Sequence, residues 1–540
     1  MTELNSAMVE IYDTTLRDGT QGLDFNLTSA DKVAIAKRLD SFGVDFIEGG
    51  WPGSNPKDVT FFAMMRDVPL LHARLSAFGS TRRKHTAPED DVNLQALLEA
   101  HTPVVTIFGK SWDLHVTEAL GASLEENLEM IRDSVAYMKS LGKMVIYDAE
   151  HFFDGYRADA AYALATVSAA AAGGADRIVL CDTNGGSLPQ DIAARIHELR
   201  ATLETALGIH AHNDCELAVA NSLSAVQAGA CHVQGTINGY GERCGNANLV
   251  SILPNLVLKL GYTQAQNLEH LREISRYIDE RANMQPYARA AYVSDAAFAH
   301  KGGVHVSAVN KNPHTYEHID PAVVGNKRRV LLSDLSGRAN VLAKSLEYGQ
   351  KVSPQDPQVR DIVTRLKELE NRGYAFEGAE ASYMLMSKKV CGEYSPYFTL
   401  HGYHVAITKR DSDGIPVCEA VVKVEVAGQL EHTAANGDGP VNALDRALGK
   451  ALQRFYPSLA ELELRDYKVR VLSGEEKGTA SVVRVLVETS DGRNTWGTVG
   501  ASTDIIDASY EALIDAIEYK LLSDNVTPQE QALPAHSSLA

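Results

Sequence analysis

The stretch His210-Ala211-His212-Asn213-Asp214 has the residue types and the spacing of a metal site. It follows the apolar residues Leu207-Gly208-Ile209, which predict the core of a β-strand. Residues two apart on a strand point to the same side, so the two imidazoles would lie in parallel. Such a pair can bind a divalent metal, but an isolated pair can equally be packed or hydrogen-bonded at a strand end. The choice depends on which other groups the chain brings to this point.

Strand and helix patterns alternate over the first 260 residues. Eight strands are expected. Seven have the bounds 8–13, 44–48, 74–78, 104–108, 144–147, 177–180 and 233–237, and the remaining one, the seventh in chain order, is the segment that enters the histidine pair. Helices are expected at 29–42, 57–66, 89–100 and 123–141. Ser123 and Glu126 are spaced as a capping box. Eight such units predict an α/β fold, a parallel sheet closed into a (β/α)₈ TIM barrel. An open doubly wound sheet is the alternative, and the lack of GxGxxG after the first strand disfavours it.

Active sites of such barrels lie at the C-terminal ends of the strands, where this chain places many polar residues. The residues that follow predicted strands are Arg17 and Asp18; Glu48; Asp148, Glu150 and His151; Asp182, Thr183 and Asn184; His210, His212, Asn213 and Asp214; and Asn238, Glu242, Arg243 and Asn246. Barrel closure makes strands seven, eight and one neighbours, so Asp18, His210, His212 and Asn246 can converge. This donor set suits Mg²⁺, Mn²⁺ or Zn²⁺ and leaves positions for water or substrate, as a catalytic metal requires.

The residues beside this set allow two readings each. Arg17 can be an ion-pair partner of the site, or its guanidinium can stabilise an oxyanion as it develops. Asp148 and Glu150 can be solvated carboxylates of the rim, or one of them can act as a general base or orient one.

Longer phrases carry a resemblance to a known family. Residues 13–19 (DTTLRDG) and the HxHND stretch resemble the metal-dependent barrels that condense an acyl-CoA with a 2-keto acid, namely the 2-isopropylmalate, homocitrate and citramalate synthases, and related aldol-type lyases. The phrases at 47–56, 108–112, 148–155, 239–249 and 300–305 bring it nearest to the (R)-citramalate synthase group. The resemblance runs over nearly the whole chain.

The resemblance implies an acyltransferase that joins acetyl-CoA, pyruvate and water to give (R)-citramalate and CoA, the first step of the pyruvate route to 2-oxobutanoate and isoleucine. It implies that Asp18, His210, His212 and Asn246 bind the metal and that Arg17 polarises the ketone. It also implies that Thr183 holds the substrate carboxylate and that Asp148, like Arg17, binds substrate. Glu150 falls where the family has a substrate-positioning or catalytic carboxylate. His305 matches a family histidine that enters the site from beyond the barrel, and Tyr316 matches its partner more loosely.

The composition restricts the class of protein. The hydrophobic fraction is 45%, and 51 basic against 70 acidic residues give a net charge of −19, which disfavours nucleic-acid binding. No apolar run approaches the length of a membrane span, and the polar residues 1–8 predict no secretory signal, so a cytoplasmic protein is expected. The six cysteines lack CxxC spacing and are most simply buried thiols.

Beyond the barrel the alternation stops. Helical patterns at 268–283 and 358–372 flank the basic run Lys327-Arg328-Arg329, which is either a solvated face or an aid to binding CoA phosphates. From residue 397 a βββα pattern occurs twice, with turns at 411–414 and 490–492 and helices at 441–455 and 505–522. We therefore predict a barrel over 1–265, a mainly helical linker over 266–380, a regulatory and dimerisation domain over 381–523 and a disordered tail over 524–540.

The repeat resembles the C-terminal regulatory domain of the isopropylmalate synthase group. The resemblance implies a homodimer with isoleucine as the feedback inhibitor; a purely structural dimerisation module is the alternative. The same chemistry on a larger 2-keto acid, and retro-aldol cleavage by a related lyase, are the nearest alternative functions. A non-catalytic amino-acid sensor on a retired barrel would have lost part of the metal set, which is present in full.

Overall fold

The computed structural model describes residues 5–263, 266–348, 353, 355–409, 414–472 and 480–527. It divides into two compact units. The first comprises Met1–Phe298 and Ile319–Arg328, and the second comprises Ala299–His318 and Arg329–Ala540.

The first unit contains the expected closed parallel barrel, which confirms the predicted fold. Neighbouring strands follow chain order and the last pairs with the first, with Glu10 beside His232 and Asp13 beside Gly235. The barrel strands are β2 (Glu10–Asp13), β3 (Phe46–Gly50), β4 (Arg74–Ser80), β5 (Val104–Lys110), β6 (Met144–Glu150), β7 (Arg177–Asp182), β8 (Ala206–Ala211) and β9 (His232–Gly235). A short pair, β1 (Asn5–Met8) with β10 (Tyr262–Thr263), lies outside the barrel.

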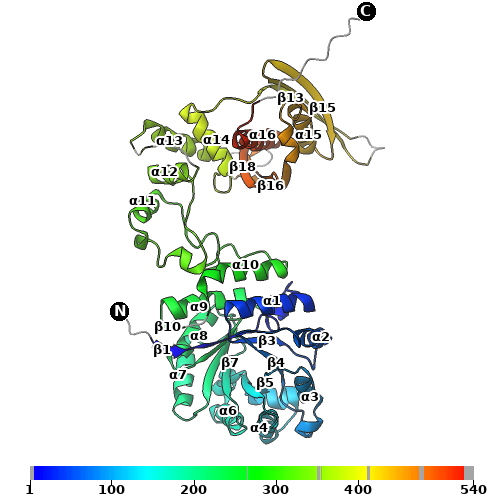
Figure 1. Cartoon of the computed structure of the whole chain (residues 1–540), viewed down its shortest axis with the longest axis vertical. Helices are drawn as coiled ribbons and strands as arrows, with labels where there is room; N and C mark the ends of the chain where they lie inside the picture. The colour runs from blue at the N-terminus through cyan, green and yellow to red at the C-terminus, as the bar shows by residue number, and fades with distance from the viewer. Residues whose placement is uncertain are drawn as a thin grey trace, which may run out of the picture. The chain divides into compact units, whose positions relative to one another are not determined.

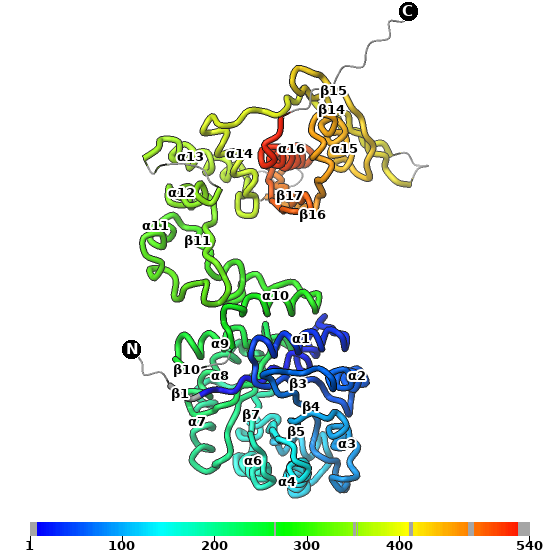
Figure 2. Tube along the Cα trace, in the orientation of Figure 1, coloured from blue at the N-terminus to red at the C-terminus, as the bar shows by residue number. Residues whose placement is uncertain are grey.

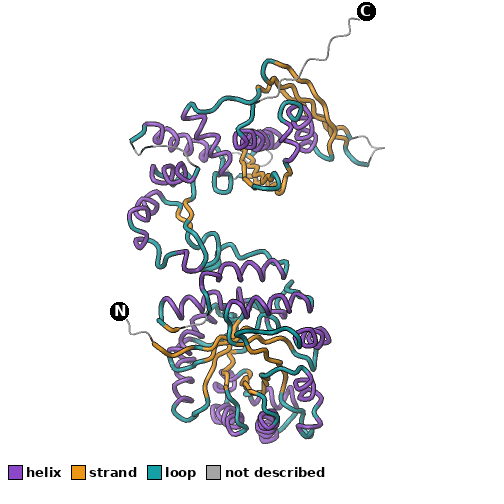
Figure 3. The backbone as a smooth tube through the Cα atoms, viewed as in Figure 1, coloured by secondary structure: helices purple, strands orange, loops and turns teal. Residues whose placement is uncertain are grey.

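Helices surround the barrel strands (Figures 1 and 3). They are α1 (Ser29–Phe42), α2 (Pro56–Met65), α3 (Val92–Glu99), α4 (Leu124–Ser140), α5 (Phe152–Ala158), α6 (Ala160–Ala172), α7 (Pro189–Arg200), α8 (Ala218–Gln227) and α9 (Leu249–Leu258). One further helix, α10 (Leu271–Arg281), lies beside α1, to which an ion pair between Arg38 and Glu273 joins it (Figure 2). The apolar faces of these helices and the outward side chains of the strands form one continuous core, because each strand is buried on both sides.

Side-chain caps fix where the helices begin. Thr28 and Asp31 form a full capping box at the start of α1. The box predicted at Ser123 and Glu126 is only half formed: Ser123 accepts from the Glu126 N–H, but the Glu126 carboxylate does not return to Ser123. It accepts instead from the His85 N–H at 3.0 Å and from Arg82 Nη1 at 3.2 Å, and the charged arginine is a stronger donor than the Ser123 N–H.

Two ion pairs, one buried and one half-buried, hold the barrel ends. Lys32, 1% exposed, donates to the Asp58 carboxylate at the start of α2 and to the Gly49 carbonyl at 3.2 Å. At the opposite end of the strands Glu10 accepts from Arg177 at 2.9 Å and lies 3.3 Å from His232 Nδ1. Each pair ties neighbouring elements together, and the Lys32–Asp58 pair is closed off from water.

The strand ends differ from those predicted. Several carboxylates that were expected to follow the strands are part of the strands. Asp148 and Glu150 lie within β6, and Asp182 is the last residue of β7. Each of these side chains has a partner in the folded chain: Gln234 donates to Asp148, Lys110 pairs with Glu150, and Ser187 donates to Asp182.

The second unit begins with a small parallel pair, β11 (Ala299–His300) with β12 (Arg329–Val330), and contains the helices α11 (Gly303–Lys311), α12 (Arg338–Glu347), α13 (Pro357–Asn371) and α14 (Glu380–Cys391). The two βββα copies follow, each an antiparallel sheet packed on its own helix. The first is β13 (Thr399–Thr408), β14 (Val417–Val426), β15 (Gln429–Gly437) and α15 (Pro440–Leu452), and the second is β16 (Glu463–Val471), β17 (Val483–Ser490), β18 (Thr495–Ser502) and α16 (Ile505–Asp524). Residues 411–413 of the predicted turn and residues 528–540 of the predicted tail lie outside the described residues.

Two further findings concern the surface. No helix among the described residues is long and apolar enough to cross a membrane. The prediction that all six cysteines are buried is wrong: Cys181 and Cys418 are buried, Cys231 and Cys391 are half-buried, and Cys215 and Cys244 are exposed. The two exposed thiols lie in loops that follow β8 and β9, where the chain leaves the core.

Candidate active site

Asp18, His210 and His212 meet at the C-terminal end of the barrel. All three are buried, and one ligand atom from each lies within 4.8 Å of the others. Asp18 Oδ2 is 3.3 Å from His210 Nε2 and 4.0 Å from His212 Nε2, and the two imidazole nitrogens are 3.3 Å apart. His210 is the next-to-last residue of β8 and His212 directly follows the strand, so the alternation of the strand turns both rings toward the turn after β2.

The hydrogen bonds around His210 determine which of its nitrogens is free. Gln234 donates from Nε2 to Asp148 Oδ1 at 2.9 Å, so its Oε1 accepts from His210 Nδ1, also at 2.9 Å. The lone pair of His210 therefore lies on Nε2 and faces another acceptor, Asp18 Oδ2. Either a proton on Nε2, which would then be donated to Asp18 Oδ2, or a bound cation must lie between two acceptors at this distance.

The electrostatics of the cluster show which of its groups carry charge when a proton occupies this position. Burial opposes charge on Asp18, but Arg17 and His210 hold the pKa of its carboxyl well below the ordinary value. Burial also opposes charge on His210, and its hydrogen bond with Asp18 nevertheless raises the pKa of this imidazole. Burial, reinforced by His210, lowers the pKa of His212 to about 4, so His212 is neutral at pH 7 and offers a lone pair. A carboxylate and two imidazoles without a thiolate fit a divalent cation.

Asn246 lies beside this cluster on the loop after β9. Its backbone pairs with that of His212. Its Nδ2 donates to the Tyr240 carbonyl at 3.2 Å, while its buried Oδ1 has no hydrogen-bond partner among the described residues. An orphaned buried amide oxygen next to two metal-binding side chains matches the predicted fourth ligand.

Arg17 is held in a fixed orientation at the edge of the cluster. Its Nε donates to Glu48 Oε2 at 2.6 Å, its Nη1 is 3.5 Å from Asp18 Oδ2, and its guanidinium carbon lies 3.8 Å from the centre of the Phe78 ring. Glu48 is fully buried and also accepts from the Tyr12 hydroxyl at 2.9 Å. The guanidinium therefore keeps its charge and its direction without needing a bound anion.

A cavity of about 200 Å³ opens beside these residues. Its wall includes all of the predicted barrel site residues except Asn246, together with the aromatic rings of Trp51, Phe78 and Phe108. Phe78 and Phe108 stack with ring centres 5.2 Å apart, and Trp51 meets both edge-on. Trp51 is anchored from Nε1 to Asn93 Oδ1 at 2.8 Å. The cavity thus has a charged side and an aromatic side.

The remaining predicted barrel residues lie on the charged side of the cavity. Glu150 is paired with Lys110, so it is not a free solvated carboxylate. Thr183 Oγ1 accepts from the His151 N–H at 2.9 Å, which leaves the threonine hydroxyl proton to donate elsewhere. Asp148 lies deeper, and burial raises the pKa of its carboxyl to about 7.

His305 and Tyr316 belong to the second unit. Their rings stack with centres 4.2 Å apart and an angle of 27° between their planes. The structure thus brings this pair together, and their part in the barrel site remains a prediction.

Sequence reasoning missed several residues of the site. Gln234, Lys110 and the Trp51, Phe78 and Phe108 rings were not assigned a role. A polar residue in the middle of a buried strand was the available signal for Gln234, because such a side chain needs a partner. The aromatic residues gave no signal, since rings at strand ends are usual core residues.

Comparison with protein families divides the chain into three parts. Residues 8–278 match the HMGL-like family, residues 292–374 match the homocitrate synthase post-HMGL domain-like family, and residues 377–521 match the LeuA allosteric (dimerisation) domain. HMGL-like barrels are metal-dependent, in agreement with the possible metal site at Asp18, His210 and His212.

Similar proteins extend over the whole length. The chain is 55% identical to the (R)-citramalate synthase of Geobacter sulfurreducens over 95% of this chain and 98% of that protein, and 53% identical to that of Aquifex aeolicus over 96% and 98%. A 2-isopropylmalate synthase of Methanocaldococcus jannaschii is 31% identical over 94% of each chain. From these identities and coverages, the chain belongs to the (R)-citramalate synthase family.

Proposed function

We propose that this chain condenses acetyl-CoA with pyruvate and water to give (R)-citramalate and CoA. The observation that carries the proposal is the combination of a prepared metal cluster, a fixed guanidinium and a small cavity at one end of the barrel, in a chain about half identical to (R)-citramalate synthases. The identity to a 2-isopropylmalate synthase is far lower, which disfavours that alternative. The reaction would begin the pyruvate route to 2-oxobutanoate and isoleucine, in the cytoplasm as the sequence predicts.

Asp18, His210, His212 and Asn246 would hold the divalent cation. Hard oxygen donors with two imidazoles favour Mg²⁺ or Mn²⁺ and also allow Zn²⁺. When bound, the cation would polarise the keto oxygen of pyruvate.

Arg17 stabilises the negative charge that grows on the keto oxygen as the acetyl carbon bonds to the ketone carbon. Its guanidinium is held by Glu48 and stacked on Phe78, so it costs no reorganisation when the charge develops. Removing one such preoriented donor typically slows turnover about a hundredfold or more.

The substrate carboxylate is expected to lie near Thr183, whose hydroxyl proton is free to donate. Glu150, fixed by Lys110, positions the substrate or the base. His305 with Tyr316 is the candidate that takes the proton from the acetyl methyl, since an imidazole nitrogen can accept a proton. Water then hydrolyses the thioester of the product and releases CoA.

The aromatic side of the cavity supports pyruvate as the keto acid. Phe78 and Phe108 stack against each other, and Trp51 closes the corner between them. The three rings offer an apolar surface against which the methyl group of pyruvate can pack.

The C-terminal domain is proposed to join two copies of the chain and to bind isoleucine as a feedback inhibitor. The LeuA dimerisation match supports the homodimer. Isoleucine would be the end product of the proposed route. Its binding to this domain would slow the condensation when isoleucine is abundant.

Release of thiol from acetyl-CoA across a panel of 2-keto acids tests the proposal. We expect turnover with pyruvate that depends on added metal and is weak with 2-ketoisovalerate. His212→Ala should abolish this turnover and retain the fold by circular dichroism. His197→Ala, on the exposed face of α7, is the matched control and should keep wild-type activity. The proposal would be refuted if none of the keto acids in the panel caused thiol release.

A further inference from the structure

Arg243 lies in the loop after β9 and lines the same cavity as Arg17, yet the proposed condensation gives it no role. Its φ of 56° falls in the left-handed region, which is unfavourable for a residue with a side chain. Two residues later Gly245 has a φ of 93°, and a Cβ there would lie 2.0 Å from the Gly239 carbonyl oxygen. The loop is therefore tightly folded, and other contacts must compensate for the backbone conformation of Arg243.

The guanidinium of Arg243 contacts two other loops. Its Nε and Nη2 donate to the two carboxylate oxygens of Asp214, at 2.8 and 2.9 Å, and Nη2 also donates to the Thr183 carbonyl at 2.6 Å. Asp214 belongs to the loop after β8, and Thr183 belongs to the loop after β7. Paired, charge-assisted hydrogen bonds of this kind fix the geometry as well as adding stability. One side chain thus joins three successive loops at the C-terminal end of the barrel.

Each of these three loops carries a group of the candidate site. Thr183 is expected to bind the substrate carboxylate, and His212 and Asn246 are expected to bind the metal. The backbones of His212 and Asn246 are paired, so the second and third loops already form one unit. The bond from Arg243 to the Thr183 carbonyl reaches past β8 and connects this unit to the first loop.

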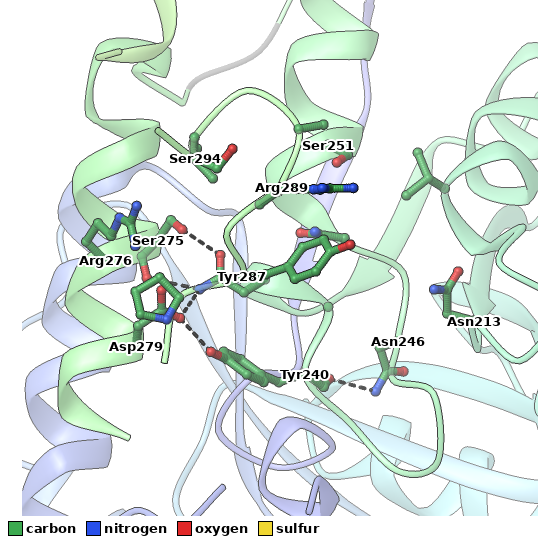
Figure 4. A pocket seen from close by; sticks show the side chains of 18 of the residues that line it. Asn213, Tyr240, Asn246, Ser251, Ser275, Arg276, Asp279, Tyr287, Arg289 and Ser294 are labelled. Carbon is green, nitrogen blue, oxygen red and sulfur yellow. Dashed lines mark hydrogen bonds between the residues drawn. The ribbon is translucent and has the colours of Figure 1, made fainter. Parts of the chain in front are cut away.

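The loop after β9 is also attached to α10, independently of Arg243. This loop, α10 and the segment 285–294 border a second cavity, of about 370 Å³. The Tyr240 hydroxyl donates to Asp279 Oδ1 of α10 at 2.5 Å, and Asn246 Nδ2 donates to the Tyr240 carbonyl at 3.2 Å (Figure 4). Replacing Arg243 should therefore break the link to Thr183 and leave the loop folded against α10.

The donors of Arg243 are already occupied. A guanidinium has five N–H groups, of which Nε carries one and Nη2 carries two. These three are donated to Asp214 and Thr183, and Nη1 lies 3.6 Å from the Glu242 carboxylate. Two carboxylates balance the charge of the guanidinium, which favours a role in holding the loops over direct binding of the substrate.

We propose that Arg243 is a positioning residue. By joining the three loops it fixes the distance from Thr183 to the metal-binding side chains. The inference rests on the proposed condensation, in which pyruvate places its carboxylate at Thr183 and its keto oxygen at the metal. These two groups are on adjacent carbons, so the ketone is aligned with Arg17 only when the loops keep their spacing. A displacement of about 1 Å can slow a reaction about a hundredfold.

Calorimetric titration of pyruvate into the Mn²⁺-loaded full chain tests this role without turnover. Arg243→Lys keeps the charge but cannot make the paired bonds, so it should raise the Kd for pyruvate about tenfold and lower kcat for thiol release about 10–100-fold. Asp214→Asn leaves Arg243 in place and should have the same effect, and the double variant should be no worse than either single variant.

Two controls separate positioning from a loss of structure. The three variants should keep the far-ultraviolet circular dichroism and the urea midpoint of wild type, because partly exposed ion pairs add little stability. Arg132→Gln removes a similar contact with Asp133 from the exposed surface of α4, and it should leave the Kd for pyruvate and kcat unchanged.

Wild-type Kd and kcat in Asp214→Asn would overturn the proposal, because they would show that Arg243 does not act through the paired loops. Single-variant effects that multiply in the double variant would also overturn it. Failure of the condensation itself gives a different result. In that case no keto acid would cause thiol release from acetyl-CoA in wild type, while the Kd for pyruvate would still rise in the variants.

Discussion

Replacing Gln234 by Leu tests how the barrel prepares its metal cluster. Gln234 is fully buried and links His210 Nδ1 to Asp148 Oδ1 by two hydrogen bonds of 2.9 Å. Leucine fills a similar volume and removes both bonds. His210 Nδ1 then stays buried without an acceptor, at a cost of about 1–3 kcal/mol, and the proton is no longer confined to that nitrogen. Loss of such an orienting partner typically weakens metal binding about 10–100-fold.

Electron paramagnetic resonance of free Mn²⁺ measures this effect directly and does not depend on turnover. We expect the Kd for Mn²⁺ to rise about 10–100-fold in Gln234→Leu, with little change in far-ultraviolet circular dichroism. Gln227→Leu, on the exposed face of α8, is the control and should bind Mn²⁺ as wild type does. Wild-type Mn²⁺ affinity in a folded Gln234→Leu variant would show that the link does not orient His210.

Three other substitutions test the fold and the cavity. Lys32→Ala leaves a buried carboxylate without its cation and should lower the free energy of unfolding by about 3–5 kcal/mol in urea titrations; a loss below about 1 kcal/mol would contradict the pairing. Burial raises the pKa of Glu10, but His232 and Arg177 outweigh it and lower this pKa to about 2. The Glu10 carboxylate therefore stabilises the fold fully above about pH 4.5, and this stabilisation is lost as the pH falls toward 2. Glu10→Gln should therefore cost about 2 kcal/mol at pH 7 and progressively less below pH 4.5; a cost independent of pH in matched urea titrations would refute this. Phe108→Ala should raise kcat/KM for 2-oxobutanoate relative to pyruvate about tenfold, and an unchanged ratio would remove Phe108 from the specificity wall.

The barrel could be predicted because its signal is local and repeated. Apolar runs with period 2 alternate with runs of period 3.6, and eight repeats allow few other closures. Closure then places Asp18 next to the histidine pair, although the two segments are far apart in the sequence. The helix Ser29–Phe42 was predicted with its observed bounds, because both its cap and its terminal glycine are local features.

The features that the sequence could not predict depend on which of several possible partners a side chain contacts in the folded chain. Glu126 could have completed a capping box, but Arg82 and the His85 N–H are better partners, and only the folded chain brings them near. Gln234 acquires a role only when β9 closes beside β8. The second cavity depends on the segment 285–294, which has no repeated pattern and is held in place by single side chains.

The stereochemistry and stoichiometry of the product test the central claim most directly. Acetyl-CoA labelled in the methyl carbon is incubated with pyruvate, Mn²⁺ and the full chain, and the acids are separated by chiral chromatography. The proposed function predicts labelled (R)-citramalate, one molecule for each CoA released. Labelled 2-isopropylmalate from added 2-ketoisovalerate in preference to citramalate, or CoA release without a labelled condensation product, would contradict it.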